Sequence, residues 1–145
     1  MGTLKVFISY SSTDKEKADE ICEYLEKHGK KCWIAPRDIS AGAQYGEEII
    51  NGIENSNVVV LIFSKAANES QHVLREVERA VNKKIPVIAF KIENSVLSKS
   101  MEYFLLSNQW LDAVDDMQGM LEPLSDSIDK IYKLNSRSVN GDAVT

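Results

Sequence analysis

Short apolar runs alternate with amphipathic stretches along most of the chain. Residues 57–64 (NVVVLIFS) are β-branched and almost wholly apolar, which predicts a central strand that is covered on both faces. The run at residues 107–111 (SNQWL) is short and more polar, so it predicts a strand at an edge of the sheet. The predicted strands are residues 4–9, 31–35, 57–64, 85–92 and 107–111.

Amphipathic patterns separate these runs. Apolar positions at i, i+3, i+4 and i+7 predict a helix around residues 18–25, with Thr13 and Glu16 as a capping box at its start and Gly29 as its stop. Residues 36–43 (PRDISAGA) have the composition of a loop. Three further helices are predicted from the apolar positions Tyr45, Ile49 and Ile53, from Val73, Leu74, Val77, Ala80 and Val81, and across residues 117–134.

The alternation of strand and helix predicts an α/β fold with a mostly parallel sheet and helices on both faces. Residues 1–135 are predicted to form one domain. Residues 136–145 are polar and aperiodic, so we expect them to be a disordered tail.

The composition is that of a globular domain, and the net charge argues against some classes of partner. The 145 residues are 43% hydrophobic and 27% charged, and their formal net charge is −5. This acidity argues against a nucleic-acid binder and against an anionic membrane surface as a partner. No apolar stretch approaches the ~20 residues of a membrane span, and the first residues lead into a strand rather than a signal peptide. We therefore expect a cytoplasmic protein.

The two cysteines, Cys22 and Cys32, lack the spacing of a redox or zinc motif. Two buried free thiols are a better interpretation than a disulfide or a metal site. Since no group of histidine, cysteine and carboxylate residues has ligand spacing, we expect no bound metal.

Sheets of this kind bind ligands beyond the carboxyl ends of their strands. The residues at these ends therefore show whether the chain carries the motifs of the common functions of this fold class. Residues 9–14 (SYSSTD) contain no glycine, which argues against a nucleotide or flavin phosphate loop. Ser64 and Lys65 follow the third strand, where a response-regulator receiver would need an aspartate. The usual cofactor and receiver functions of this fold class are therefore not expected.

Four segments form a combined pattern in the sequence. They are residues 7–11 (FISYS) with Asp14, residues 33–39 (WIAPRDI) with Gly42, residues 73–77 (VLREV) preceded by Ser64 and Ser70 and followed by Ala80, and residues 86–88 (PVI). Their order and spacing, over residues 4–113, resemble the TIR (Toll/interleukin-1 receptor homology) domain family.

The resemblance implies a flavodoxin-like three-layer sandwich with a five-stranded parallel sheet. It also implies either an adaptor that binds other TIR domains or an enzyme that cleaves NAD⁺ between nicotinamide and ribose. We favour the enzyme, of the free-standing microbial type, with NAD⁺ as substrate and no separate cofactor. Its products would be nicotinamide and ADP-ribose, or a cyclic or derivatised ADP-ribose signal in anti-phage defence. The alternative is a non-catalytic adaptor or virulence mimic that acts through TIR–TIR contacts; self-association is expected in either case.

Glu76 matches the family's catalytic glutamate. Nicotinamide leaves NAD⁺ as a neutral molecule, so the difficulty of the reaction is the oxocarbenium-like charge on the ribose. One carboxylate held against the sugar can stabilise that charge. On the predicted helix, Glu76 projects about 100° from the core stripe, at the border of the buried face. Without the family motif, a solvated glutamate paired with Arg75 or Arg79 would be the better interpretation.

The candidate substrate-binding residues are Ser9, Tyr10, Ser11, Arg37 and His72. The first three end the first strand at the predicted cleft, although Tyr10 could equally serve packing. Arg37 could meet a phosphate through two hydrogen bonds or pair with Asp38. His72 stands where many catalytic members carry tryptophan; it could stack on a base or be a surface histidine.

Overall fold

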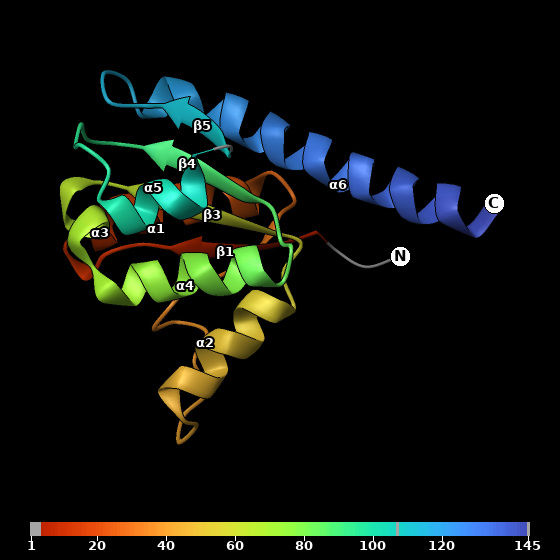
Figure 1. The fold of residues 1–145 in the computed structure, drawn as a ribbon, viewed down its shortest axis with the longest axis horizontal. Helices are drawn as coiled ribbons and strands as arrows, with labels where there is room; N and C mark the ends of the chain where they lie inside the picture. Colours follow the sequence, from red (N-terminus) through yellow and green to blue (C-terminus); the bar gives the residue numbers. More distant parts are fainter. Residues whose placement is uncertain (1–3, 107, 145) are drawn as a thin grey trace.

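The computed structural model describes residues 4–106 and 108–144, and its centre is a five-stranded sheet in which every strand pair is parallel (Figure 1). The strand order is β2-β1-β3-β4-β5, which is the flavodoxin-like order. The predicted fold class is therefore confirmed. The strands are β1 (Lys5–Ser9), β2 (Lys31–Trp33), β3 (Val58–Phe63), β4 (Val87–Lys91) and β5 (Gln109–Asp112).

Six α-helices and two 3₁₀ turns connect and cover these strands in the described residues. The helices are α1 (Lys15–Lys27), α2 (Tyr45–Glu54), α3 (Lys65–Glu69), α4 (Gln71–Asn82), α5 (Lys99–Leu105) and α6 (Leu121–Val144), and the turns are Ser12–Asp14 and Gln118–Met120.

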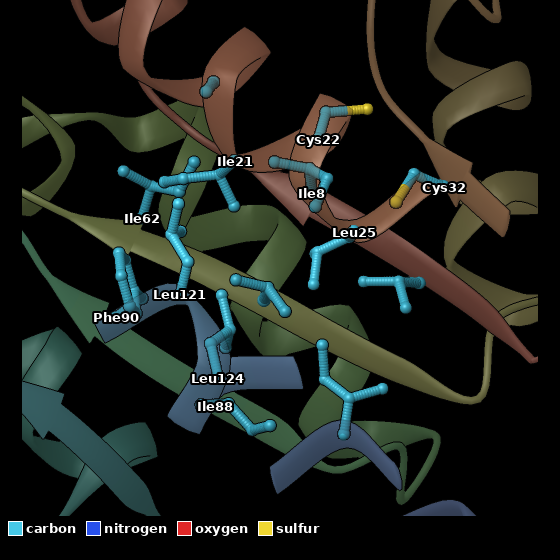
Figure 2. Packing of buried hydrophobic residues seen from close by; sticks show 14 of the residues in the cluster. Ile8, Ile21, Cys22, Leu25, Cys32, Ile62, Ile88, Phe90, Leu121 and Leu124 are labelled. Atoms are coloured by element: carbon cyan, nitrogen blue, oxygen red, sulfur yellow. The ribbon is translucent and has the colours of Figure 1, made fainter. Parts of the chain in front are cut away.

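Two hydrophobic cores lie on opposite faces of the sheet. On one face, Ile21 of α1 and Leu124 of α6 pack against alternate residues of the strands (Figure 2). On the other face, Ile53 of α2, Val77 of α4 and Met101 of α5 pack against the intervening residues. All six residues of β3 are buried, as predicted for a central strand between two helix layers.

Strand β1 is the point where the connections diverge. From β1 the chain runs through α1 to β2 at one edge, and it returns through α2 to β3 on the other side of β1. In open α/β sheets a crevice forms outside the carboxyl ends of the strands at such a switch point. The carboxyl end of β1 is therefore where the fold itself favours a ligand site.

Trp33 at the end of β2 is a packing residue. Its ring stacks on Phe7 of β1 with 5.0 Å between ring centroids. Gly52 of α2 lies directly against the indole, and a Cβ atom at that glycine would come within 2.8 Å of two ring carbons. The helix can approach β2 this closely because position 52 has no side chain.

The start of α1 differs from the prediction. Residues Ser12–Asp14 form a 3₁₀ turn, α1 begins at Lys15, and its N-cap residue makes no side-chain hydrogen bond. The Thr13 hydroxyl instead lies 3.2 Å from the Ser11 hydroxyl. The capping box predicted from Thr13 and Glu16 is therefore wrong.

Two short helices were not predicted. Helices α3 and α5 contain five and seven residues, which is too short for a hydrophobic period to show. Each begins at a serine whose hydroxyl accepts a backbone N–H: Ser64 from Ala67 at 3.0 Å and Ser98 from Met101 at 3.1 Å. Serine caps were the signal that could have revealed both helices.

The ends of three elements also differ from the bounds that the sequence predicted. Strand β2 stops at Trp33, two residues before the predicted end, and β5 covers Gln109–Asp112, whereas residue 107 lies outside the described part of the chain. Helix α6 continues to Val144 and extends past the sheet (Figure 1). Residues 136–144 are therefore helical where a disordered tail was predicted. Once a helix has formed, each added residue gains one backbone hydrogen bond, and no proline interrupts this segment.

A buried lysine fixes α6 to the body of the domain. Lys30, just before β2, donates to the Ser125 hydroxyl at 2.7 Å and lies 3.0 Å from the Asp129 carboxylate. Both partners are on α6, so the helix docks through a paired charge as well as through apolar contacts. None of the described helices combines the length and apolar content that a membrane crossing requires.

Candidate active site

Glu76 lies on α4 with its carboxylate turned towards the carboxyl end of β1. Ser70 caps the start of this helix, because its hydroxyl accepts the Val73 N–H at 3.1 Å. Glu76 is only 7% exposed. The fully buried hydroxyl of Ser9, the last residue of β1, donates to Oε1 of Glu76 at 2.6 Å. The sequence predicted that Glu76 lies at the border of the buried face of its helix. In the structure its carboxylate packs against the end of β1.

His72 lies one helical turn before Glu76 and contacts the other carboxylate oxygen. Its Nε2 is 3.1 Å from Oε2 of Glu76, and its side chain is 53% exposed. The hydrogen bond to Glu76 raises the pKa of His72, although partial burial opposes this shift. The His72 ring also lies 6.1 Å from the Tyr45 ring at the start of α2. Glu76 therefore has one buried partner and one partner that solvent reaches.

A cleft of about 200 Å³ opens beside this pair at the switch point. Most of its lining comes from the end of β1, the segment after β2, and α4. The Tyr10 hydroxyl donates to the Ala35 carbonyl, which ties these first two segments together. Burial is the main cause that raises the pKa of Tyr10. Five of the six predicted site residues meet here. Tyr10, Ser11, His72 and Glu76 line the cleft, and the Ser9 hydroxyl reaches Glu76 from beneath it.

A second cavity of about 310 Å³ lies between α2 and α4 and shares His72 and Glu76 with the cleft. Its α2 wall is apolar, formed by Ile49, Ile50 and Ile53. Small-molecule sites usually enclose about 300–1,000 Å³, so the cleft alone is smaller than a dinucleotide needs. The cavity between α2 and α4 is at the lower end of that range, and it adjoins the cleft at His72 and Glu76.

Arg37 is not brought to the cleft. Its guanidinium donates twice to Glu26 of α1 at 2.9 Å, to the Cys32 carbonyl at 3.0 Å and to Asp38 at 2.9 Å. These carboxylates raise the pKa of Arg37 further above its already high value. The predicted phosphate contact is therefore not supported by this geometry, whereas the alternative pairing with Asp38 is confirmed. Sequence spacing could not reveal Glu26, which reaches Arg37 from another element.

The loop of residues 36–43 is tied down at both ends. Asp38 accepts the Ile34 N–H at 2.8 Å, and Glu48 of α2 accepts the Ser40 N–H at 2.8 Å. The second bond lowers the pKa of Glu48. Together with Arg37, these contacts hold the loop between α1 and α2, beside the segment that borders the cleft.

Cys22 and Cys32 are buried free thiols, as predicted. The structure also brings their sulfur atoms and a Glu26 carboxylate oxygen within 4.8 Å of one another, a potential ligand group that spacing did not reveal because α1 and β2 each supply part of it. The Arg37 guanidinium already pairs with Glu26 and lies 3.7 Å from the Cys22 sulfur. A fixed positive charge in this position opposes a metal cation there.

The match to a known family decides the identity of the domain. The family model for the TIR domain matches residues 6–124, which include all of the sheet except Lys5, the first residue of β1, and the whole of α4. The chain belongs to the TIR domain family. The resemblance inferred from four sequence segments is thereby confirmed, and Glu76 of this TIR domain lies within the matched residues.

Solved structures share the fold. The TIR domain of a Toll-related receptor from Hydra magnipapillata is 24% identical, with a TM-score of 0.72 over 86% of this chain and 97% of that one. A TIR-STING receptor from C. gigas is 22% identical, with a TM-score of 0.65 over 87% of this chain and 38% of that one. A CMP N-glycosidase from Clostridium botulinum is 13% identical, with a TM-score of 0.61 over 83% and 97%. None of the curated proteins compared matches this TIR domain.

Proposed function

We propose that this TIR domain cleaves NAD⁺ at the bond between nicotinamide and ribose, with Glu76 as its catalytic carboxylate. The observation that supports this most strongly is a buried carboxylate beside a cleft at the switch point, with one oxygen held by Ser9. The N-glycosidase with the same fold is consistent with the proposal, because its name describes cleavage between a base and a sugar.

The reaction needs little from the protein beyond electrostatics. The C1′–N bond breaks, its electron pair goes to the pyridinium nitrogen, and nicotinamide leaves neutral. The positive charge that develops on the ribose is stabilised by the Glu76 carboxylate. Low exposure strengthens this interaction, because little water screens the carboxylate.

The two partners of Glu76 have different roles in this proposal. Ser9 is buried and stays hydrogen-bonded to Oε1, so it orients the carboxylate. His72 is half exposed and contacts Oε2 on the solvent side. A ribose hydroxyl takes the place of the imidazole at Oε2 when the substrate binds.

The acceptor decides the product. Attack of water on the ribosyl cation gives ADP-ribose and a proton, and attack by an atom of the same molecule gives a cyclic ADP-ribose. On either route NAD⁺ is consumed, so it is a substrate rather than a cofactor. No step of the proposed reaction requires a metal. The family resemblance supports a role for such a product as a signal in anti-phage defence in the cytoplasm.

We also propose that activity requires self-association. The cleft is open and small, so a neighbouring copy could cover the part of a dinucleotide that one domain leaves exposed. Tyr103 and Leu106 are large apolar side chains that stand exposed at α5, a feature typical of protein contact surfaces. Specific activity should therefore rise with enzyme concentration, and a flat response over a wide range would contradict self-association.

The exposed residues at α5 also favour a second candidate function, a non-catalytic adaptor that docks onto other TIR domains. Incubation of the purified chain with NAD⁺ separates the two. We expect nicotinamide to be released, in equal amounts with and without a chelator, and mass spectrometry to identify the second product. An inert parent at every concentration would favour the adaptor, and activity lost to a chelator and restored by one metal would contradict the mechanism.

A further inference from the structure

A pair of thiols lies apart from the cleft and takes no part in the proposed reaction. Cys22 on α1 and Cys32 on β2 lie together at a border of one hydrophobic core (Figure 2). Their sulfur atoms are within 4.8 Å of each other, and the two residues are 3% and 5% exposed. Neither thiol is in a disulfide. Burial next to a second thiol makes intramolecular pairing more favourable than pairing with another chain.

The surroundings of the two sulfurs differ. Nη1 of Arg37 lies 3.7 Å from the Cys22 sulfur, and this guanidinium reaches solvent. The hydrogen bond from Cys32 lowers the pKa of the Cys22 thiol and the Arg37 charge adds to this effect, whereas burial and the Glu26 carboxylate oppose it. The same hydrogen bond and burial raise the pKa of the Cys32 thiol. Reactive cysteines lie near cationic groups, so Cys22 has the features of an attacking thiolate and Cys32 those of a resolving thiol.

We propose that Cys22 and Cys32 form a hydroperoxide-reactive dithiol that closes into a disulfide. The Cys22 thiolate attacks a peroxide oxygen, the O–O bond breaks, and the departing hydroxide takes up a proton to leave as water. Cys22 is now a sulfenic acid. The Cys32 sulfur attacks it, the S–O bond breaks, and a second water leaves with the Cys32 proton. The two thiols are oxidised by two electrons, and the peroxide is reduced to two waters.

The geometry allows the bond with local movement. A disulfide has an S–S distance of about 2.05 Å, so the two sulfurs must approach from their present separation of at most 4.8 Å. The bond would join α1 to β2 directly before the loop of residues 36–43.

The disulfide would also change the contacts that anchor the loop of residues 36–43. Arg37 donates to the Cys32 carbonyl and contacts the Cys22 sulfur. Oxidation replaces the Cys22 thiol beside the guanidinium with a disulfide sulfur and moves both sulfurs. This inference concerns the thiols alone and does not depend on the cleavage of NAD⁺.

Treatment of the folded full chain with hydrogen peroxide, followed by alkylation and intact-mass measurement, tests the proposal. We expect the parent to lose two hydrogens, to become resistant to alkylation at both positions, and to recover with dithiothreitol. Peptide mapping should locate one bond between Cys22 and Cys32 within a single chain. Two free, alkylatable thiols after peroxide, or bonds only between chains, would overturn it.

Single variants test the order of the two steps. In Cys32→Ala, a sulfenic-acid reagent such as dimedone should label Cys22. In Cys22→Ala, labelling of Cys32 should be lower by about 10-fold or more, because burial raises the pKa of that thiol and the Arg37 guanidinium contacts the Cys22 sulfur rather than the Cys32 sulfur. Equal labelling would contradict the assignment of Cys22 as the attacking thiol. The parent experiment needs no substitution, so it decides the main question even where a variant folds poorly.

Discussion

Ser9 and Glu76 are 67 positions apart in the sequence, and a 2.6 Å hydrogen bond joins their side chains inside the protein. Ser9 belongs to the end of a central strand, and Glu76 belongs to a helix that packs on the sheet. The carboxylate is therefore positioned by the sheet as well as by its own helix. Since Ser9 is fully buried, water cannot easily replace its hydroxyl.

Replacement of Glu76 by glutamine is the most direct test of the proposed chemistry. Glu76→Gln keeps the size of the side chain and removes the negative charge, so we expect the release of nicotinamide to fall by about 10²-fold or more. Nicotinamide should be measured together with the melting curve of each variant.

Glu78→Gln is the matched control, because Glu78 is an exposed glutamate on the same helix that does not line the cleft. It does border the neighbouring cavity between α2 and α4, so a change of a few-fold is acceptable. Full activity in Glu76→Gln, or equal losses in both variants, would contradict the role of Glu76.

Ser9→Ala removes the buried donor and leaves Oε1 of Glu76 without a partner. An unsatisfied buried acceptor costs about 1–3 kcal/mol, so we expect lower stability by that amount and a lower kcat with a smaller change in KM. Ser11→Ala is the comparison, since Ser11 lines the cleft and has no hydrogen bond to Glu76 among the described contacts. If Ser11→Ala reduced kcat as much as Ser9→Ala, the positioning role of Ser9 would be lost.

The candidate position for the catalytic carboxylate was predicted from the sequence because two signals coincide at Glu76. The core stripe around Val73 and Val77 defines which face of α4 is buried, and both residues are buried in the structure. The family motif then distinguishes Glu76 from other glutamates on the helix. The hydrogen bond from Ser9 could not be derived from spacing, because it depends on how α4 sits across β1.

The His72–Glu76 contact predicts how stability depends on pH. The hydrogen bond to Glu76 raises the pKa of His72 above its ordinary value of 6.5. A histidine with a higher pKa in the folded chain adds stability that is fully present below pH 6.5 and is lost as the pH rises through the raised pKa. His72 is half exposed, so solvent screening limits the contribution to less than about 1 kcal/mol.

This pH dependence is tested by comparing the melting temperatures of the parent and of His72→Gln from below pH 6.5 to above the raised pKa of His72. We expect the parent to be the more stable protein at acidic pH and the difference to shrink as the pH rises above the raised pKa. A difference that stayed constant, or that grew with pH, would show that the charged pair does not stabilise the fold.

Two glycines on α2 make a matched pair for a packing test. In Gly52→Ala, the new methyl group would meet the Trp33 indole at 2.8 Å, so we expect a loss of about 1–3 kcal/mol of stability from overpacking. In Gly46→Ala, nothing lies within 4 Å of the new methyl group. That variant should be neutral or slightly more stable, because alanine favours a helix over glycine by about 1 kcal/mol. Equal melting temperatures would contradict close packing of α2 on Trp33.

The sequence was least informative where side chains from different elements compete for the same group. Arg37 was assigned two possible partners, and only Asp38 could be seen in the sequence because it is adjacent. Glu26 of α1 accepts two of the Arg37 hydrogen bonds and holds the guanidinium against that helix. The capping box at Thr13 fails for a similar reason, since a 3₁₀ turn precedes α1 and moves the helix start to Lys15.

The His72 imidazole, through its contact with Oε2 of Glu76, competes with any ligand that binds this oxygen. The imidazole is an internal ligand for the oxygen that faces solvent, present at high effective concentration because it is held on the same helix. Any molecule that needs this oxygen must displace it first. The apparent affinity is then the intrinsic affinity multiplied by the fraction of molecules whose imidazole has moved away. The His72 side chain therefore raises the concentration at which such a molecule occupies the site, and substitution of this one residue should lower that concentration.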